Sequence, residues 1–362
     1  MSKKPQVFLE SHNIKNLNFG FGQFNYHLIK GIAALNTEDL DITLNAKDTQ
    51  KLKSEFGNNF KYRTYKSLSR YPLFRIKKKY DLWHSLNQNI KVEPFFDIPY
   101  VLTVHDVNFV DEVSNDMSHK RNVRFQEKLN RCHAITYISD YAKTSTHNYF
   151  KIPNVPEFVI YNGNPITEVD IPDGYIPEVN TKRPFFYFIG EFSERKNIHT
   201  LIEMLAHLPD FDLVLSGKNK TEYGETKLAK TISHLKLEHR VLITGKVSDT
   251  DKQYYLKNCT AFVFPSLREG FGIPPIEAMR FGKPVFMSNN TSLPEIGSNH
   301  AFYWDNYNPD YMATIVKEGL DKYDKNKTEL SKAYAAHAKS FDWKKAASEY
   351  LEVYRTVLKN NQ

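Results

Sequence analysis

Cysteine is nearly missing from this chain of 362 residues, which contains only Cys132 and Cys259. Two thiols make neither a disulfide framework nor a zinc site. Long apolar runs are missing too, and none approaches the roughly 20 residues that a membrane span needs. The apolar run near the N-terminus is too short for a signal peptide. We therefore expect a protein of the cytoplasm.

The remaining composition is that of an ordinary globular protein, with 41% hydrophobic and 25% charged residues. The length suits about two domains, at roughly 100–200 residues each. The net charge of +7 indicates an anionic partner. Nucleic acid, an acidic membrane and a phosphorylated substrate all fit, and charge alone does not choose among them.

Short β-rich runs alternate with helical patterns along the whole chain. In the first half the runs are QVFLES, DITLNA, YDLWHS, YVLTVHD, AITYIS and FVIYNG, and in the second FFYFIG, DLVLSG, VLITG, AFVFPS, PVFMSN and AFYWD. Several are apolar throughout, as strands buried on both faces of a parallel sheet must be. The alternation predicts βαβ units and a doubly wound α/β architecture.

We expect an N-terminal Rossmann-like domain at 1–168, a C-terminal one at 169–340 and a closing helix at 341–362. The proline-rich segment Pro165–Pro184 suits an exposed linker between the two domains.

The stretch SLREGFGIPPIEAM, residues 266–279, holds Glu269 and Glu277 on either side of a glycine turn. The turn follows an apolar strand, and the two prolines favour a helix start. A helix start behind a parallel strand is an anion site. A carboxylate accepts two hydrogen bonds from a vicinal diol, so the pair suits a nucleotide sugar with its diphosphate in between. The alternative is that Glu277 caps the helix and Glu269 is solvated.

The stretch FIGEFSERKN forms a second candidate site, where a strand ends at Gly190 and Arg195 and Lys196 are predicted to open a helix. Cations at a helix start oppose the macrodipole, and a bound anion would explain them. The guanidinium fork and the ammonium both suit phosphate oxygens. The alternative is a solvated basic turn.

Two signals in the first half are weaker. Gly20 and Gly22 form a glycine turn before an amphipathic helix, without the third glycine of a dinucleotide fingerprint. His105 and Asp106 end an apolar strand, where a doubly wound fold binds its ligand. His105 would donate to a substrate oxygen with Asp106 holding the ring. The alternatives are a tight strand-to-helix turn and a structural polar pair.

Three D-x-D patterns resemble the metal motif of some sugar transferases: Asp39–Asp41, Asp210–Asp212 and Asp249–Asp251. The first two border strands as turns, and the third is predicted to lie at the start of a helix that Ser248 or Asp249 caps. We therefore expect no metal site, and expect Arg195, Lys196 and the helix dipole to neutralise leaving-group charge.

Together these motifs resemble glycosyltransferase family 4, whose members are retaining enzymes of the GT-B fold. The glutamate pair within PSLREGFGIPPIEAMRFGKPV, the E-x7-E element, is the most specific part. GEFSERKN, VHD, YISDYAK, VIYNGNP, SLPEIG and FDWKKAASEYLEVY extend the resemblance over nearly the whole chain. It implies two Rossmann-like domains facing each other across a cleft, with the closing helix crossing back to the N-terminal domain.

The resemblance also implies a role for each candidate residue with a nucleotide-sugar donor. Arg195 and Lys196, behind Gly190, would hold the diphosphate, Glu277 the ribose, and Glu269 the sugar hydroxyls, with the backbone N–H groups of Phe271, Gly272 and Ile273. His105 would lie near the anomeric carbon, Gly20 and Gly22 near the phosphates, and Val247 near the base, with Asp106 as a further substrate-binding residue. One departure is Glu191, where many relatives carry arginine.

The expected activity is metal-independent retaining transfer of a hexose, such as mannose or glucose, from a GDP- or UDP-linked donor. A glycan or lipid-linked molecule in bacterial surface polysaccharide synthesis would accept the sugar. We expect no nucleic-acid partner. The basic run Arg75–Tyr80 is either a solvated loop or a contact with an anionic membrane. The alternatives are another GT-B enzyme, an epimerase or a sugar-phosphate synthase, or a non-enzymatic protein that binds nucleic acid or anionic surfaces.

Overall fold

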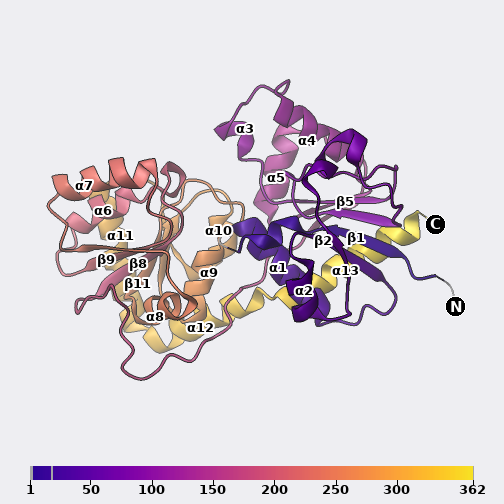
Figure 1. Cartoon of the computed structure of the whole chain (residues 1–362). Coiled ribbons are helices and arrows are strands. Elements are labelled where there is room, and N and C mark those ends of the chain that lie inside the picture. Colours follow the sequence, from indigo (N-terminus) through magenta and orange to yellow (C-terminus); the bar gives the residue numbers. More distant parts are fainter. Residues whose placement is uncertain (1–2, 18, 362) are drawn as a thin grey trace. The chain divides into compact units, whose positions relative to one another are not determined.

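A computed structural model describes residues 3–17 and 19–361 of the chain (Figure 1). They form two compact units. The N-terminal unit comprises the chain up to Pro165 together with the residues from Asp342 onward, and the C-terminal unit comprises Ile166–Phe341.

The N-terminal unit is built on a parallel sheet of seven strands in the order β3-β2-β1-β4-β5-β6-β7. The strands are β1 Gln6–Glu10, β2 Asp41–Ala46, β3 Lys61–Thr64, β4 Leu82–Ser85, β5 Tyr100–Val104, β6 Ala134–Tyr137 and β7 Glu157–Val159. The helices are α1 Gly20–Ala33, α2 Thr49–Phe56, α3 Phe109–Glu112, α4 Lys120–Asn130, α5 Asp140–Tyr149 and α13 Trp343–Asn360. Strands β4, β5 and β6 are buried throughout, as expected of a sheet covered on both faces.

The C-terminal unit repeats this architecture with six parallel strands in the order β10-β9-β8-β11-β12-β13. The strands are β8 Phe185–Ile189, β9 Asp212–Ser216, β10 Val241–Gly245, β11 Ala261–Phe264, β12 Val285–Ser288 and β13 Phe302–Trp304. The helices are α6 His199–Ala206, α7 Ala229–His234, α8 Asp249–Asn258, α9 Ile273–Arg280, α10 Leu293–Gly297, α11 Pro309–Lys325 and α12 Lys327–Ser340. In both sheets the chain reverses its direction of winding beside the first strand, which makes the Rossmann switch point.

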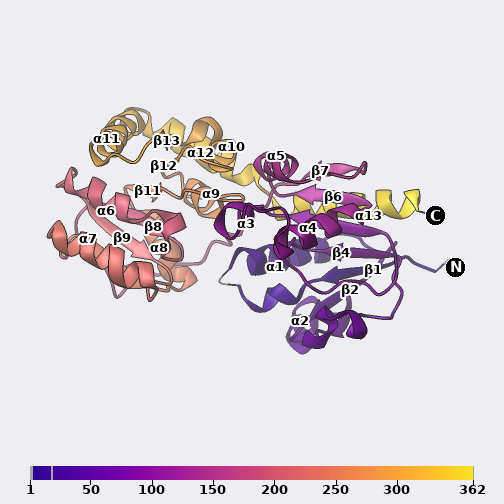
Figure 2. The ribbon, with the colours of Figure 1, turned by 90° about the horizontal axis from the view of Figure 1, so that it is seen from above.

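The last helix, α13, belongs to the N-terminal unit, as the expected crossing-back helix requires (Figure 2). It packs on α1, where a Cβ at Gly31 would lie 2.8 Å from Cβ of Ala347. It also reaches the sheet, since Tyr354 Oη lies 2.7 Å from Nδ1 of the buried His84. Within the described residues, no helix has the length and apolar character needed to cross a membrane.

One strand was missed by the sequence analysis. Strand β3 was not predicted, because its residues KYRT are polar and an edge strand exposes such side chains. The proline-rich segment after Pro165 is largely exposed, as expected, and it also lies along α8. Gln253 accepts from the Val169 amide at 3.1 Å, and Tyr175 donates to Asp251 at 2.5 Å.

Candidate functional site

The main candidate site lies at the switch point of the C-terminal sheet, where β8 and β11 are neighbours. The loop after β8 carries Arg195 and Lys196, and the loop after β11 carries Ser266 and Glu269. The two loops are joined by backbone, because the Leu267 amide donates to the Arg195 carbonyl at 2.8 Å. The fold thus brings together two motifs that are 73 residues apart in sequence.

Arg195 and Lys196 do not open a helix, contrary to our expectation. They lie in a short 3-10 turn, Glu194–Lys196, which ends at the left-handed residue Asn197 before α6 begins. The conflict between these cations and a helix dipole therefore does not arise. Their negative counter-charge is supplied by the protein itself, through Glu269.

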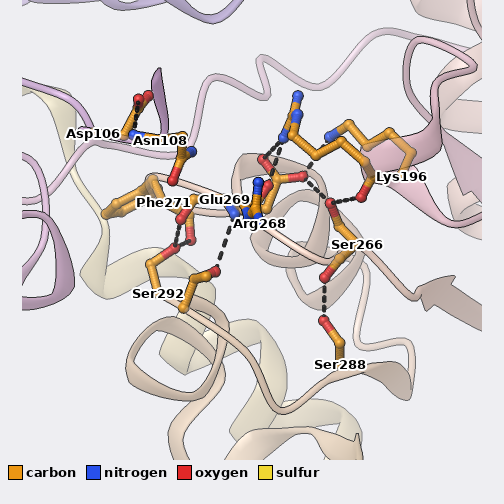
Figure 3. A network of polar contacts seen from close by, with 11 residues as sticks. Asp106, Asn108, Lys196, Ser266, Arg268, Glu269, Phe271, Ser288 and Ser292 are labelled. Carbon is orange, nitrogen blue, oxygen red and sulfur yellow. Dashed lines mark hydrogen bonds and ion pairs between the residues drawn. The ribbon is translucent and has the colours of Figure 1, made fainter. Parts of the chain in front are cut away.

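Glu269 is the centre of a polar network, not a solvated acid (Figure 3). Its Oε1 accepts from Lys196 Nζ at 2.5 Å and from Ser266 Oγ at 2.5 Å, and its Oε2 lies 3.1 Å from Arg195 Nη1. The side chain of Glu269 is only 13% exposed, and that of Lys196 only 10%. A carboxylate oxygen accepts two bonds, so Oε1 is saturated, whereas the one contact given for Oε2 among the described residues is that with Arg195.

The pKa values of Glu269 and Lys196 are shifted from their ordinary values. Burial by itself raises the pKa of Glu269, but the charges of Lys196 and Arg195 and the bonds from Lys196 and Ser266 outweigh it and lower the pKa to about 2. Burial lowers the pKa of Lys196, while contact with Glu269 opposes that change. Perturbed groups at a switch point are typical of a functional site.

The glycine turn ahead of α9 has the form predicted from its sequence. Gly272 is the residue before the helix and has a φ of 116°, a left-handed conformation that favours glycine. Pro274 and Pro275 have no N–H, so the backbone donors at this helix start are those of Gly272 and Ile273. Ser292 donates to the Phe271 carbonyl at 2.8 Å and so fixes the turn from the side of α10.

Glu277 lies one turn into α9 and is not a helix cap. Its Oε1 lies 2.7 Å from Lys252 Nζ of α8, and its side chain is 5% exposed. The two glutamates of the motif are therefore held by two separate ion pairs. Lys252 was missed by sequence reasoning, because α8 meets α9 only in the tertiary structure.

Gly190 and Val247 follow two other strands of the same sheet. Gly190 comes directly after β8, and a Cβ there would lie 3.5 Å from Cε of Lys196, so Gly190 borders the cluster. Val247 comes after the edge strand β10 and packs against the hydrophobic core of the unit. Its predicted role next to the base stays a prediction.

In the N-terminal unit, Gly20 and Gly22 differ in their surroundings. A Cβ at Gly22 would lie 1.9 Å from the Asn16 carbonyl oxygen, so close packing of α1 on the preceding turn requires this glycine. Among the residues that the structure describes, a Cβ at Gly20 would meet no atom within 4 Å. Close packing thus explains Gly22 without any ligand, whereas the described residues offer no such explanation for Gly20.

His105 is oriented by a hydrogen bond to the backbone. Its Nε2 donates to the Leu86 carbonyl at 2.9 Å, which leaves Nδ1 as an acceptor in the neutral ring. Burial lowers the pKa of His105 to about 4, so the ring is neutral at pH 7. The expected donor role is thereby corrected to an acceptor role. Asp106 accepts from the Asn108 amide at 3.1 Å.

The D-x-D patterns are engaged in contacts inside the two units. Asp39 pairs with Arg355, Asp41 with Lys61, Asp212 with Arg183, and Asp251 accepts from Tyr175. Ser248 caps α8 as predicted, by accepting from the Asp251 amide. Across the residues that the structure describes, no cluster of three or more His, Cys, Asp or Glu is arranged to hold a metal ion.

Comparisons with known proteins agree with this architecture. Residues 176–341 match the family model described as glycosyl transferases group 1. The chain is 25% identical to the O-antigen chain mannosyltransferase B of Escherichia coli, over 97% of this chain and 100% of that protein.

Two solved structures match nearly the whole chain. Sucrose-phosphate synthase from Thermosynechococcus elongatus matches with a TM-score of 0.74 and 18% identity, over 99% of this chain and 100% of that one. A structure of Anabaena Alr3699/HepE in complex with UDP-glucose matches with a TM-score of 0.68 and 18% identity, over 97% and 100%. The structural matches show the GT-B fold. The family model and the curated relative show that this chain is a glycosyltransferase.

Proposed function

We propose that this glycosyltransferase moves a hexose, with mannose as the first candidate, from a GDP- or UDP-linked donor to a glycan or lipid-linked acceptor. The process served would be synthesis of a bacterial surface polysaccharide, in the cytoplasm. The observation that carries the proposal is the Arg195–Lys196–Glu269 cluster at the switch point of the C-terminal sheet. The mannosyltransferase relative supports the sugar, and the UDP-glucose complex of a structural neighbour supports the donor class.

The donor diphosphate would bind Arg195 and Lys196. These two cations share the one carboxylate of Glu269, so the three side chains together keep a net positive charge. The Gly272 and Ile273 amides of the α9 start would add donors to the phosphates. As the sugar leaves, charge builds on the diphosphate, and these fixed groups would stabilise it without a metal ion.

Glu269 would bind the sugar of the donor and Glu277 its ribose, as in glycosyltransferase family 4, to which we assign the chain. Oε2 of Glu269 suits one sugar hydroxyl without loss of the Lys196 bond. Glu277 keeps acceptor positions beyond its Lys252 bond and suits the two ribose hydroxyls. Val247 would border the base.

Residues of the N-terminal unit would also serve the donor. Neutral His105 would accept a bond from a hydroxyl of the donor sugar at Nδ1, with Asp106 next to it at the strand end. The Gly20 amide, at the start of α1, would face the phosphates, with Gly22 shaping that turn. Retention would follow from attack on the same face as the leaving phosphate, which would take the proton of the acceptor.

A thermal-shift panel of GDP, UDP, ADP and their sugar derivatives tests the donor class, because a ligand that binds only the folded state raises apparent stability. Arg195→Gln should weaken binding of the best nucleotide by about 10- to 150-fold, the loss of a charge-assisted bond. Lys227→Gln is the control, since Lys227 makes an exposed pair with Glu194. If the two variants bound the nucleotide with equal affinity, Arg195 would not be part of the donor site.

Product analysis tests the reaction itself. With the best donor and a glycan acceptor, NMR of the product should show the anomeric configuration of the donor sugar, at the same rate with and without a chelator. Conversion of the donor without any acceptor would instead indicate an epimerase. An inverted product would refute the retaining mechanism.

A further inference from the structure

The surplus of basic over acidic residues lies in one segment of the N-terminal unit. Residues 61–80 contain eight Lys and Arg and no Asp or Glu. The rest of the chain holds 41 basic and 42 acidic residues, a net charge of −1. The surplus that suggested an anionic partner therefore belongs to this segment and not to the protein as a whole.

The same segment exposes large apolar side chains. Leu73 is 85% exposed, Leu68 55% and Phe74 54%, although such residues are normally covered. They lie in two short 3-10 turns, Ser67–Arg70 and Pro72–Phe74, directly after the edge strand β3. Ile76 and Tyr80, both almost fully buried, anchor the segment to the core. The outward direction of the apolar side chains is thus set by packing.

A second chain segment extends this surface. Ile76 and Pro94 form a parallel bridge, and the Phe95 amide donates to the Ile76 carbonyl. Phe95 and Phe96 are 49% and 39% exposed. Lys77 Nζ lies 5.7 Å from the ring centre of Phe95, so a cation of the charged segment lies next to an apolar ring of the second segment. We call this the basic apolar surface, with Leu68, Tyr71, Leu73, Phe74, Phe95 and Phe96 as its apolar members.

We propose that the basic apolar surface docks on an anionic phospholipid bilayer. Cations next to exposed leucine and phenylalanine fit the interface of such a membrane, where phosphates attract the cations and the acyl boundary accepts the apolar groups. Nucleic acid would use the cations but has no use for Leu73, which carries no ring for stacking on a base. A bilayer is the partner that uses both features.

A pocket at the rim of the surface suits a lipid phosphate. It has a volume of about 550 Å³ and is lined by Lys47, Tyr65, Lys66, Ser67 and Leu68. Two ammonium groups and two hydroxyls are donors for phosphate oxygens. Lys66 and Leu68 belong to both the pocket and the charged segment, so a headgroup held there would lie next to the apolar members.

Docking deepens the proposed function, on which it rests for the idea that the acceptor is lipid-linked. The test needs neither donor nor acceptor, so failure of docking and failure of sugar transfer are separate results. The full chain is floated with vesicles of phosphatidylglycerol and phosphatidylethanolamine, and with vesicles of phosphatidylcholine. Binding is expected only to the anionic vesicles, and it should weaken with salt.

Two sets of variants separate the charges from the apolar groups. Changing Lys77, Lys78 and Lys79 together to Gln should weaken vesicle binding about 100-fold, at about 1 kcal/mol for each charge. The matched control changes three exposed lysines of α12, Lys327, Lys332 and Lys339, to Gln and should leave binding unchanged.

Within the apolar set, Leu73→Ser with Phe74→Ser should weaken binding at least about tenfold. Its control is Ile176→Ser, an exposed apolar residue of the other unit. Lys47→Gln should weaken vesicle binding about fivefold, because it removes one positive charge from the pocket.

A fluorescent probe tests insertion without relying on a loss of binding. Both native cysteines are buried, and burial raises the pKa of both thiols, so Leu73→Cys labels selectively with bimane. Its emission should shift to the blue on anionic vesicles and stay unchanged on phosphatidylcholine. Absence of a shift, equal binding by all variants, or capture by polyuridylate but not by vesicles would overturn the proposal.

Discussion

Glu269→Gln tests the central cluster most directly, because it removes one negative charge and keeps the shape of the side chain. The pKa of Glu269 is about 2 in the folded protein against an ordinary 4.5. That difference corresponds to about 3 kcal/mol of folding free energy at neutral pH. Removing one partner of a buried ion pair costs a similar amount, about 3–5 kcal/mol. We therefore expect the variant to lose about 3 kcal/mol at pH 7.

The loss should depend on pH in a defined direction. The folded pKa of Glu269 is lowered, so its contribution is complete above pH 4.5 and disappears as the pH falls towards 2. Urea unfolding of wild type and Glu269→Gln at several pH values measures the difference. The two curves should lie furthest apart at neutral pH and converge below pH 4.5.

Glu191→Gln is the matched control. Glu191 makes an exposed pair with Lys218 in the same unit, which is worth less than about 1 kcal/mol. If Glu269→Gln cost no more than Glu191→Gln, or if its cost stayed constant down to pH 3, the ion-pair account of the cluster would be wrong.

The remaining predictions concern single residues. Glu277→Ala should weaken nucleotide binding by about 1–3 kcal/mol, measured by calorimetry, and unchanged affinity in a folded variant would sink its ribose role. Gly22→Ala should destabilise the protein by about 1–3 kcal/mol, because its Cβ would meet the Asn16 carbonyl, whereas Gly20→Ala has room and should change stability by less than about 1 kcal/mol. His105 should stay neutral in NMR titration until about pH 4. Since the unfolded chain takes up that proton near pH 6.5, stability should decline as the pH falls between these values.

Local sequence was sufficient for most of the fold, because strands, turns and helix starts depend on neighbouring residues. Each predicted apolar run overlaps a strand, and Gly272 and Ser248 stand where their turn and cap chemistry requires them. The exception is β3, whose polar residues are tolerated because the strand lies at the edge of the sheet.

Tertiary structure alone decided what the candidate residues contact. The order of the strands makes β8 and β11 neighbours, and only that adjacency brings Glu269 to Lys196 and turns two separate motifs into one charged cluster. The pair of Lys252 with Glu277 has the same origin, since it depends on α8 lying beside α9. The exposure of Leu73 could not be predicted either, because a leucine in a sequence predicts burial. Leu73 points outward because Ile76 and Tyr80 anchor its segment to the core.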